Sequence, residues 1–141
     1  MWARDYHQRL LEWQRLRESV ADSPKPQCLD AVNRWWFGAP WSSYHLHWDD
    51  RDKWPDPWQL LQDNIFCSVA RGLGILYTVS LLQRADITDV EMIDTDLDNL
   101  VLVDSGIYVL NWEADTIVNI SLDSRKSRRR ITLSEVNQLI L

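Results

Sequence analysis

The sequence predicts an α+β fold, in which N-terminal helices and a buried central helix pack on an antiparallel β-meander. Near the N-terminus, apolar residues recur every three or four positions, as on one face of an amphipathic helix. A nearly continuous apolar segment in the middle of the chain predicts a buried helix. After Ala85 the apolar residues alternate with polar ones, which is the period of a half-buried strand. Helices followed by a run of strands are typical of α+β domains.

Residues 2–37 form the helical N-terminal part in this prediction. The apolar face of a helix over residues 2–20 carries Trp2, Tyr6, Leu10, Trp13, Leu16 and Val20. The prolines within 23–26 break this helix. A second helix can then cover 26–37, with Gly38 as its stop.

Residues 38–57 are predicted to form a tryptophan-rich loop. Of the nine tryptophans in the chain, six lie between Trp35 and Trp58. An ordered loop of about twenty residues is long for a plain connector and usually carries function. A domain of this size has limited interior for so many indole rings, and tryptophan dominates the energetics of interfaces. We therefore expect a protein contact surface built from Trp35, Trp36, Trp41, Trp48 and Trp54.

Residues 58–84 are predicted to form two central helices. Asp56 and Pro57 match the N-cap and the first position of the shorter helix. The longer helix covers about 66–83 and is apolar most of the way round, which is typical of a helix at the centre of a core. Gly72 and Gly74 each lower helix propensity by roughly 1 kcal/mol relative to Ala. This cost is tolerable if another element packs closely there.

The predicted β-meander covers residues 87–122 and is followed by a basic loop and tail over 123–141. Its strand candidates are 90–93, 100–103, 107–110 and 116–120. Turn sequences at 104–106 and 113–115 connect them as hairpins. In the tail we expect a short strand and then a terminal helix with Ser134 as its cap.

Length and composition predict one domain over residues 1–141. The 45% of hydrophobic residues suffice for a sizeable core. No run of about 18 apolar residues occurs, and the N-terminus lacks the apolar region of a signal peptide. Cys28 and Cys67 are expected to be buried free thiols rather than a disulfide scaffold. We therefore predict a cytoplasmic protein with no membrane span and no cofactor, or one carried in a particle assembled in a cytoplasm.

The net charge of −6 is distributed unevenly. Residues 85–124 contain ten acids and no Lys or Arg, so the rest of the chain is net positive. The run 125–130 carries the five cations Arg125, Lys126, Arg128, Arg129 and Arg130. Such a run can bind nucleic acid through its phosphates. We favour docking onto the acidic segment of this chain or of a second copy, and we expect other protein subunits as partners rather than nucleic acid.

The region around Cys67 resembles the transglutaminase-like branch of the papain-type fold. The resemblance rests on the segments Trp58-Gln59-Leu60-Leu61 and Asn64-Ile65-Phe66-Cys67, on Ala70 and Gly74-Ile75, and on the meander that follows. It covers residues 56–120, a little under half of the chain. In that family a cysteine begins a buried helix, and a later hairpin supplies a histidine and then an aspartate. The resemblance implies a thiolate nucleophile at Cys67, since a helix N-terminus lowers the pKa of a thiol.

The residues downstream of Cys67 depart from that family. Where the histidine is expected, at the start of the 100–103 strand, the chain has Asp98 and Asn99. At the orienting position, which closes the next strand, it has Asn111. No histidine follows His47, so the meander contains no base.

The remaining candidates for a base are His45 and His47 of the tryptophan-rich loop. Either could act on the Cys67 thiol, with Asp49 or Asp50 as the orienting carboxylate. The same imidazoles and carboxylates are also the ligand types of zinc or iron sites. We favour a buried structural thiol and two histidines without a catalytic or metal-binding role.

Two functions are compatible with these observations. The favoured one is a non-catalytic structural or adaptor component of a multi-subunit assembly. In its short length, tryptophan-rich loop, acidic meander, basic tail and degenerate enzyme-like core, the chain resembles small virion components of tailed bacteriophages. This resemblance implies a place in the tail, baseplate or neck of a virion assembled in the host cytoplasm. The alternative is a cysteine-nucleophile enzyme of the transglutaminase or cysteine-peptidase kind, with Cys67 as the nucleophile.

Overall fold

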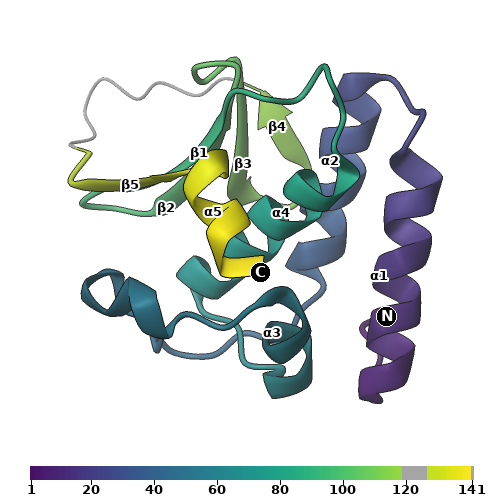
Figure 1. Ribbon diagram of the computed structural model, residues 1–141, viewed down its shortest axis with the longest axis horizontal. Helices are drawn as coiled ribbons and strands as arrows, with labels where there is room; N and C mark the ends of the chain where they lie inside the picture. Colours follow the sequence, from purple (N-terminus) through teal and green to yellow (C-terminus); the bar gives the residue numbers. More distant parts are fainter. Residues whose placement is uncertain (119–126, 141) are drawn as a thin grey trace.

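The computed structural model describes residues 1–118 and 127–140, and in them it confirms the predicted α+β class (Figure 1). The α-helices are α1 (Tyr6–Val20), α2 (Lys25–Phe37), α3 (Pro57–Asp63), α4 (Ser68–Leu82) and α5 (Leu133–Ile140). A 3-10 helix, η1, spans Trp48–Lys53. The strands are β1 (Val90–Asp94), β2 (Asn99–Val103), β3 (Tyr108–Glu113), β4 (Thr116–Val118) and β5 (Arg129–Thr132).

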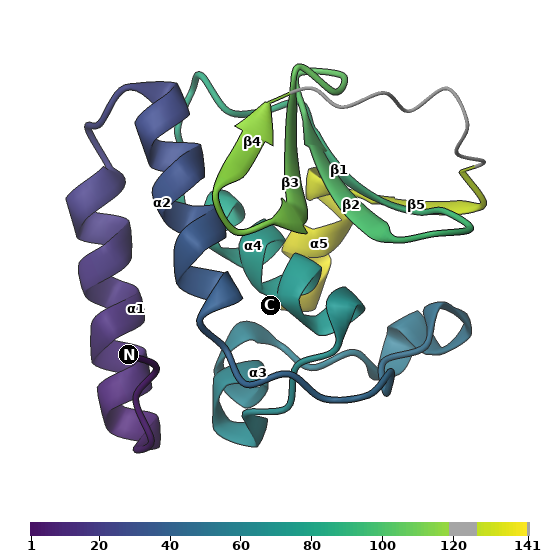
Figure 2. The ribbon, with the colours of Figure 1, turned by 180° about the vertical axis from the view of Figure 1, so that it is seen from behind.

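The five strands form one antiparallel sheet in the order β4-β3-β2-β1-β5. Strands β1 to β4 are neighbours in sequence order, as the predicted meander requires. Strand β5 returns to the other edge of β1, where Ile131 lies opposite Met92. Helix α4 packs across β1, β2 and β3, and α2 and α5 contact it (Figures 1 and 2). Helix α1 lies farther out, against α2 and α3.

Local capping signals set the starts of two helices. The carboxylate of Asp5 accepts a hydrogen bond from the backbone N–H of Gln8 at 3.3 Å. Helix α1 therefore begins after Asp5, later than the predicted start at residue 2. The Asp56 carboxylate accepts a hydrogen bond from the Gln59 N–H at 2.8 Å, and Pro57 follows as the first helical residue. The start predicted for α3 is thus confirmed.

The C-terminal tail differs from the prediction. Arg129 and Arg130 belong to strand β5 and not to an exposed loop, because β5 pairs with β1. The expected cap of the last helix, Ser134, lies inside α5. Thr132 caps the helix instead. Its hydroxyl accepts a hydrogen bond from the N–H of Glu135 at 3.3 Å, and the Glu135 carboxylate accepts one from the N–H of Thr132 at 3.1 Å.

The hydroxyl of Thr78 links three helices inside the core. It accepts hydrogen bonds from the indole Nε1 of Trp13 on α1, at 2.9 Å, and from that of Trp36 on α2, at 2.8 Å. The same hydroxyl donates to the carbonyl of Gly74 on its own helix α4, at 2.8 Å. All three hydrogen bonds are buried. An indole N–H that is buried needs a partner, and one threonine satisfies both indoles.

Two glycines let α4 approach its neighbours closely, as the sequence indicated. A Cβ atom at Gly74 would lie 2.6 Å from ring carbons of Trp36. A Cβ atom at Gly72 would lie 2.4 Å from the sulfur of Met92 on β1 and 3.0 Å from the amide nitrogen of Asn111 on β3. The lost helix propensity is therefore offset by direct packing of α4 on α2 and on the sheet.

We expect that Thr78→Val destabilises the protein by about 2–6 kcal/mol, because two buried indole N–H groups lose their acceptor at about 1–3 kcal/mol each. Thr78→Ser keeps the hydroxyl and removes one methyl group, so its cost should stay near 1 kcal/mol. Urea unfolding followed by circular dichroism measures both values. Equal losses for the two variants would show that the hydroxyl does not hold the helices together.

Candidate functional site

Cys67 is the N-cap residue of α4, so the predicted cysteine at the start of a buried helix is confirmed. Its residue surface is only 1% exposed. The side chain makes no capping hydrogen bond to the first turn of the helix. The thiol therefore lies beside the first N–H groups of α4 and is shielded from solvent.

Asn111 joins the start of α4 to the sheet. Its amide nitrogen donates to the carbonyl of Ser68, at 2.9 Å, and to the carbonyl of Asn99 on β2, at 2.7 Å. Its amide oxygen accepts a hydrogen bond from Nε of Arg71, at 2.6 Å. The backbone N–H of Asn111 donates to the side-chain oxygen of Asn33 on α2, at 2.9 Å. One asparagine thus connects α4, α2 and two strands next to Cys67.

A bulge in β3 turns Asn111 toward the helix. The residue has a φ of 67°, and the register of β3 against β4 shifts in this part of the strand. Leu110 belongs to the main core, whereas Val109 and Trp112 pack in a second apolar cluster on the sheet. In a regular strand, side chains alternate between the two faces of the sheet, which would place the Asn111 side chain on the face away from α4. The bulge turns this side chain toward α4 instead. The sequence placed Asn111 near the site, but it contained no sign of this bulge.

Asn99 occupies the position where the family resemblance expects a histidine. Its side-chain oxygen accepts a hydrogen bond from the indole Nε1 of Trp48, at 3.0 Å. Its carbonyl accepts the hydrogen bond from Asn111 described above. Through Asn111, the structure connects Asn99 to Ser68, the residue that follows Cys67. Asn99 and Asn111 are both amides, and an amide does not take up a proton near neutral pH.

The alternative group of Cys67, His45, His47 and Asp49 is not assembled. Among the described residues, no hydrogen bond joins either histidine to the cysteine. The His47 ring packs edge-on against Tyr44, with centroids 4.6 Å apart. Nδ1 of His45 is buried and has no hydrogen-bond partner among the residues that the structure describes. The Asp49 carboxylate pairs with Arg129 at 2.7 Å, so it does not orient an imidazole.

The expected tryptophan surface is mostly interior. Trp36, Trp48 and Trp54 are buried, and Trp35 is partly buried. The ring nitrogens of Trp36, Trp48 and Trp54 donate hydrogen bonds inside the fold, as when Trp54 donates to the carbonyl of His47 at 3.0 Å. Trp36, Trp48 and Trp54 therefore stabilise the core instead of forming a contact surface. Trp41 remains outside, with 66% of its surface exposed.

The basic run docks onto the acidic meander of its own chain. Arg129 donates to Asp94 through Nε and Nη2, at 3.0 and 2.9 Å, and Arg128 pairs with the same carboxylate at 3.1 Å. Arg130 pairs with Glu91 at 3.3 Å. The antiparallel pairing of β5 with β1 places these charges opposite one another. Arg125 and Lys126, which we also expected to bind, lie outside the described residues.

Arg71 is a site residue that the sequence analysis missed. Its guanidinium carbon lies 3.8 Å from the ring centroid of Phe37 and 5.3 Å from that of Trp41. Burial lowers the pKa of Arg71 to about 10, while its attraction to Cys67 opposes this shift. The available signal was that Arg71 is the one charged residue in the otherwise apolar sequence of α4.

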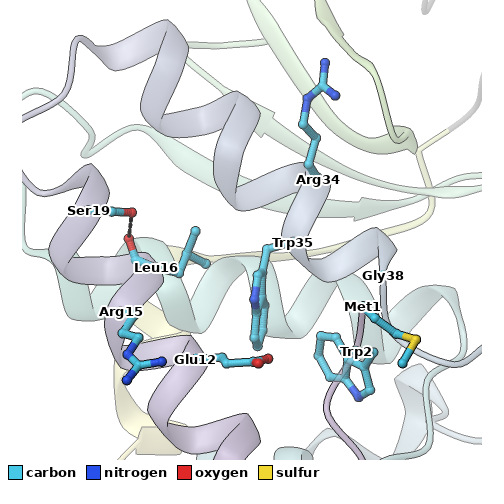
Figure 3. A pocket seen from close by; sticks show the side chains of 9 residues that line it. All are labelled: Met1, Trp2, Glu12, Arg15, Leu16, Ser19, Arg34, Trp35 and Gly38. Carbon is cyan, nitrogen blue, oxygen red and sulfur yellow. Dashed lines mark hydrogen bonds between the residues drawn. The ribbon is translucent and has the colours of Figure 1, made fainter.

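A hollow of about 540 Å³ lies between α1 and α2 (Figure 3). Trp35 points into it from α2 toward α1, and Trp2 lies beside Trp35 with ring centroids 4.6 Å apart. Its volume is in the range of small-molecule pockets. Side chains of both charge signs line it, among them Glu12 and Arg15, so its charge does not single out one class of ligand.

Comparison with known proteins assigns no family, because no family model, curated protein or solved structure matches the chain. In residues 1–118 and 127–140, no three His, Cys, Asp or Glu residues are grouped so that they could hold a metal ion. The same described part contains no helix that is long and apolar enough to cross a membrane. The functional interpretation therefore rests on the geometry of the site.

Docking of the basic run predicts unequal effects of two acids on the same strand. Asp94→Asn should lower the free energy of unfolding by about 1.5–3 kcal/mol, because a nearly buried carboxylate loses charged hydrogen bonds to two arginines. Glu91→Gln should cost less than about 1 kcal/mol, because its pair with Arg130 is more exposed. Urea unfolding at low salt measures both. A larger effect for Glu91→Gln would contradict the assignment.

Proposed function

We propose that the chain is a non-catalytic structural or adaptor subunit of a multi-subunit assembly. The observation that carries this proposal is the amide network beside Cys67. Asn99 and Asn111 stand where the family resemblance expects the base and the orienting group, and their side chains are engaged in hydrogen bonds. A thiol nucleophile requires a nearby group that accepts its proton. Neither amide can do so.

The burial of Cys67 supports the same proposal. Reactive cysteines are partly exposed and lie in electropositive surroundings. Arg71 supplies a positive charge nearby, but 1% residue exposure leaves little access for a substrate. The cysteine at this position acts as a small apolar core residue.

A contact function needs an accessible surface, and exposed apolar side chains provide one. Trp41, Tyr44 and Leu97 are exposed to 66%, 49% and 68%. Tyr44 and Leu97 line a shared hollow at the start of β2, close to Asn99. Large apolar side chains that stay in water favour a protein contact, since tryptophan and tyrosine contribute strongly to interfaces. This surface is smaller than the one expected from the sequence.

We propose further that the assembly is a virion. The resemblance to small virion components of tailed bacteriophages favours a tail, baseplate or neck, assembled in the host cytoplasm. Self-association through the acidic segment 85–124 and the basic run is less favoured by the structure than by the sequence alone. Arg128, Arg129 and Arg130 already pair within the chain. Other protein subunits remain the proposed partners.

The alternative function is that of a cysteine-nucleophile enzyme. One observation favours it, namely that Cys67 caps α4 without using its side chain. A thiolate in this position would be stabilised by the helix dipole and by free N–H groups. A base would then have to come from a second chain or from a rearranged His45 or His47.

Labelling of Cys67 with iodoacetamide distinguishes the two functions. We expect Cys67 to stay unlabelled near neutral pH until urea unfolds the protein, because the thiol is buried and lacks a base. Mass spectrometry measures the labelled fraction against pH, in a Cys28→Ser background. Fast labelling with an apparent pKa well below the ordinary value of about 8.5 would refute the non-catalytic proposal. A loss of that reactivity on replacing His45 or His47 would identify the base.

A further inference from the structure

We propose that Arg71, whose guanidinium group lies beside the rings of Phe37 and Trp41, binds an acidic side chain of a partner polypeptide. The proposal rests on the adaptor function above and specifies which kind of side chain the partner of the adaptor presents. The partner presents an Asp or Glu next to an apolar residue, which would lie against the exposed Trp41 ring.

The geometry leaves the outer part of the Arg71 guanidinium available. Nε donates to the Asn111 side chain at 2.6 Å, which fixes the plane of the group. The rings of Phe37 and Trp41 lie 3.8 and 5.3 Å from the guanidinium carbon. Among the described residues, the two terminal nitrogens have no hydrogen-bond partner. Neither of them is buried without a partner, so both reach solvent.

The charge of Arg71 is uncompensated within the described part of the chain. Ion pairs are formed there by Arg34, Arg51, Arg84, Arg128, Arg129 and Arg130. Arg71 forms none with the described carboxylates. Burial of a charge without a counter-charge is unfavourable, and the lowered pKa reflects this burial. At neutral pH the guanidinium is still protonated, so an incoming carboxylate would supply the missing charge.

Trp41 is placed to take part in the contact. Its backbone forms a parallel bridge with Phe66, and the N–H of Ser42 donates to the Phe66 carbonyl at 2.8 Å. The ring is therefore held by its backbone next to the start of α4, although 66% of its surface is exposed. An exposed indole held beside a guanidinium group is typical of the hot spots of protein interfaces, in which tryptophan and arginine are enriched.

A carboxylate fits this site better than a polyanion. Arg71 presents a planar fork that matches a carboxylate in a bidentate pair. Nucleic acid would need several unpaired cations, and the arginines of the basic run that the structure describes are already paired within the chain. The net charge of −6 also repels a polyanion.

The test uses three blocked dipeptides as probes with the full-length chain. Acetyl-Leu-Glu-amide carries the side-chain carboxylate, acetyl-Leu-Gln-amide is its neutral analogue, and acetyl-Gln-Leu with a free C-terminus carries a terminal carboxylate. Nitrogen-15 NMR follows the Arg71 Nε–H and the Trp41 indole N–H. We expect the Glu probe to shift both signals with a dissociation constant of about 1 mM, and the Gln probe to bind at least about tenfold more weakly.

Variants assign the effect to Arg71. Arg71→Gln should remove the preference for the Glu probe, as read from the Trp41 signal. Asn111→Asp keeps the arginine but gives it an internal carboxylate, so it should weaken binding of the Glu probe about tenfold. Arg34→Gln is the matched control, because Arg34 is exposed and already paired with Asp30 and Asp115, and it should leave binding unchanged.

Three results would overturn the proposal. They are equal binding of the Glu and Gln probes, a preference for the terminal carboxylate, and an effect of Arg34→Gln as large as that of Arg71→Gln. The probes contain no electrophile, so their binding is independent of thiol chemistry. A reactive Cys67 in the labelling experiment would therefore refute the adaptor function without affecting the measured probe preference.

Discussion

The hydrogen bonds to the Thr78 hydroxyl are the constraint on which the rest of the structure depends. Through them, Trp13 and Trp36 fix α1 and α2 against α4. The two indole rings lie 6.3 Å apart, and Gly74 provides the space for one of them. Because α2 ends in Phe37, its position also decides where Phe37 and Trp41 stand relative to the start of α4. A polar atom deep in the core thus determines the geometry of a surface site.

The close approach of α4 to the sheet has a second consequence. Gly72 lets the helix lie directly on Met92 and Asn111, so that the bulged Asn111 can reach the carbonyl of Ser68. The amide network beside Cys67 is therefore a product of helix–sheet packing. A side chain larger than hydrogen at position 72 would push α4 away from the sheet and so break the hydrogen bonds of Asn111.

Burial of tryptophan explains why the long loop 38–57 is ordered. The guanidinium carbons of Arg51 and Arg129 lie 5.9 and 5.8 Å from the Trp48 ring, and Trp48 donates a hydrogen bond to Asn99. Arg129 in turn pairs with Asp94. The loop, the basic strand and the acidic meander stabilise one another. The charged residues of the basic run and the acidic meander, which the sequence suggested as contact surfaces, pair with one another and stabilise the fold.

The sequence by itself determined the local features of this protein. The change of apolar period after Ala85, the Asp56 cap and the apolar helix behind Cys67 all depend on residues close together in the chain, so they could be read directly. Tertiary structure decided what depends on distant residues, namely the hydrogen bond from Trp36 to Thr78 and the pairing of Arg129 with Asp94. It also decided the turn of Asn111 toward α4 and the partly buried position of Arg71 beside Phe37, because these follow from packing between elements that no local pattern encodes.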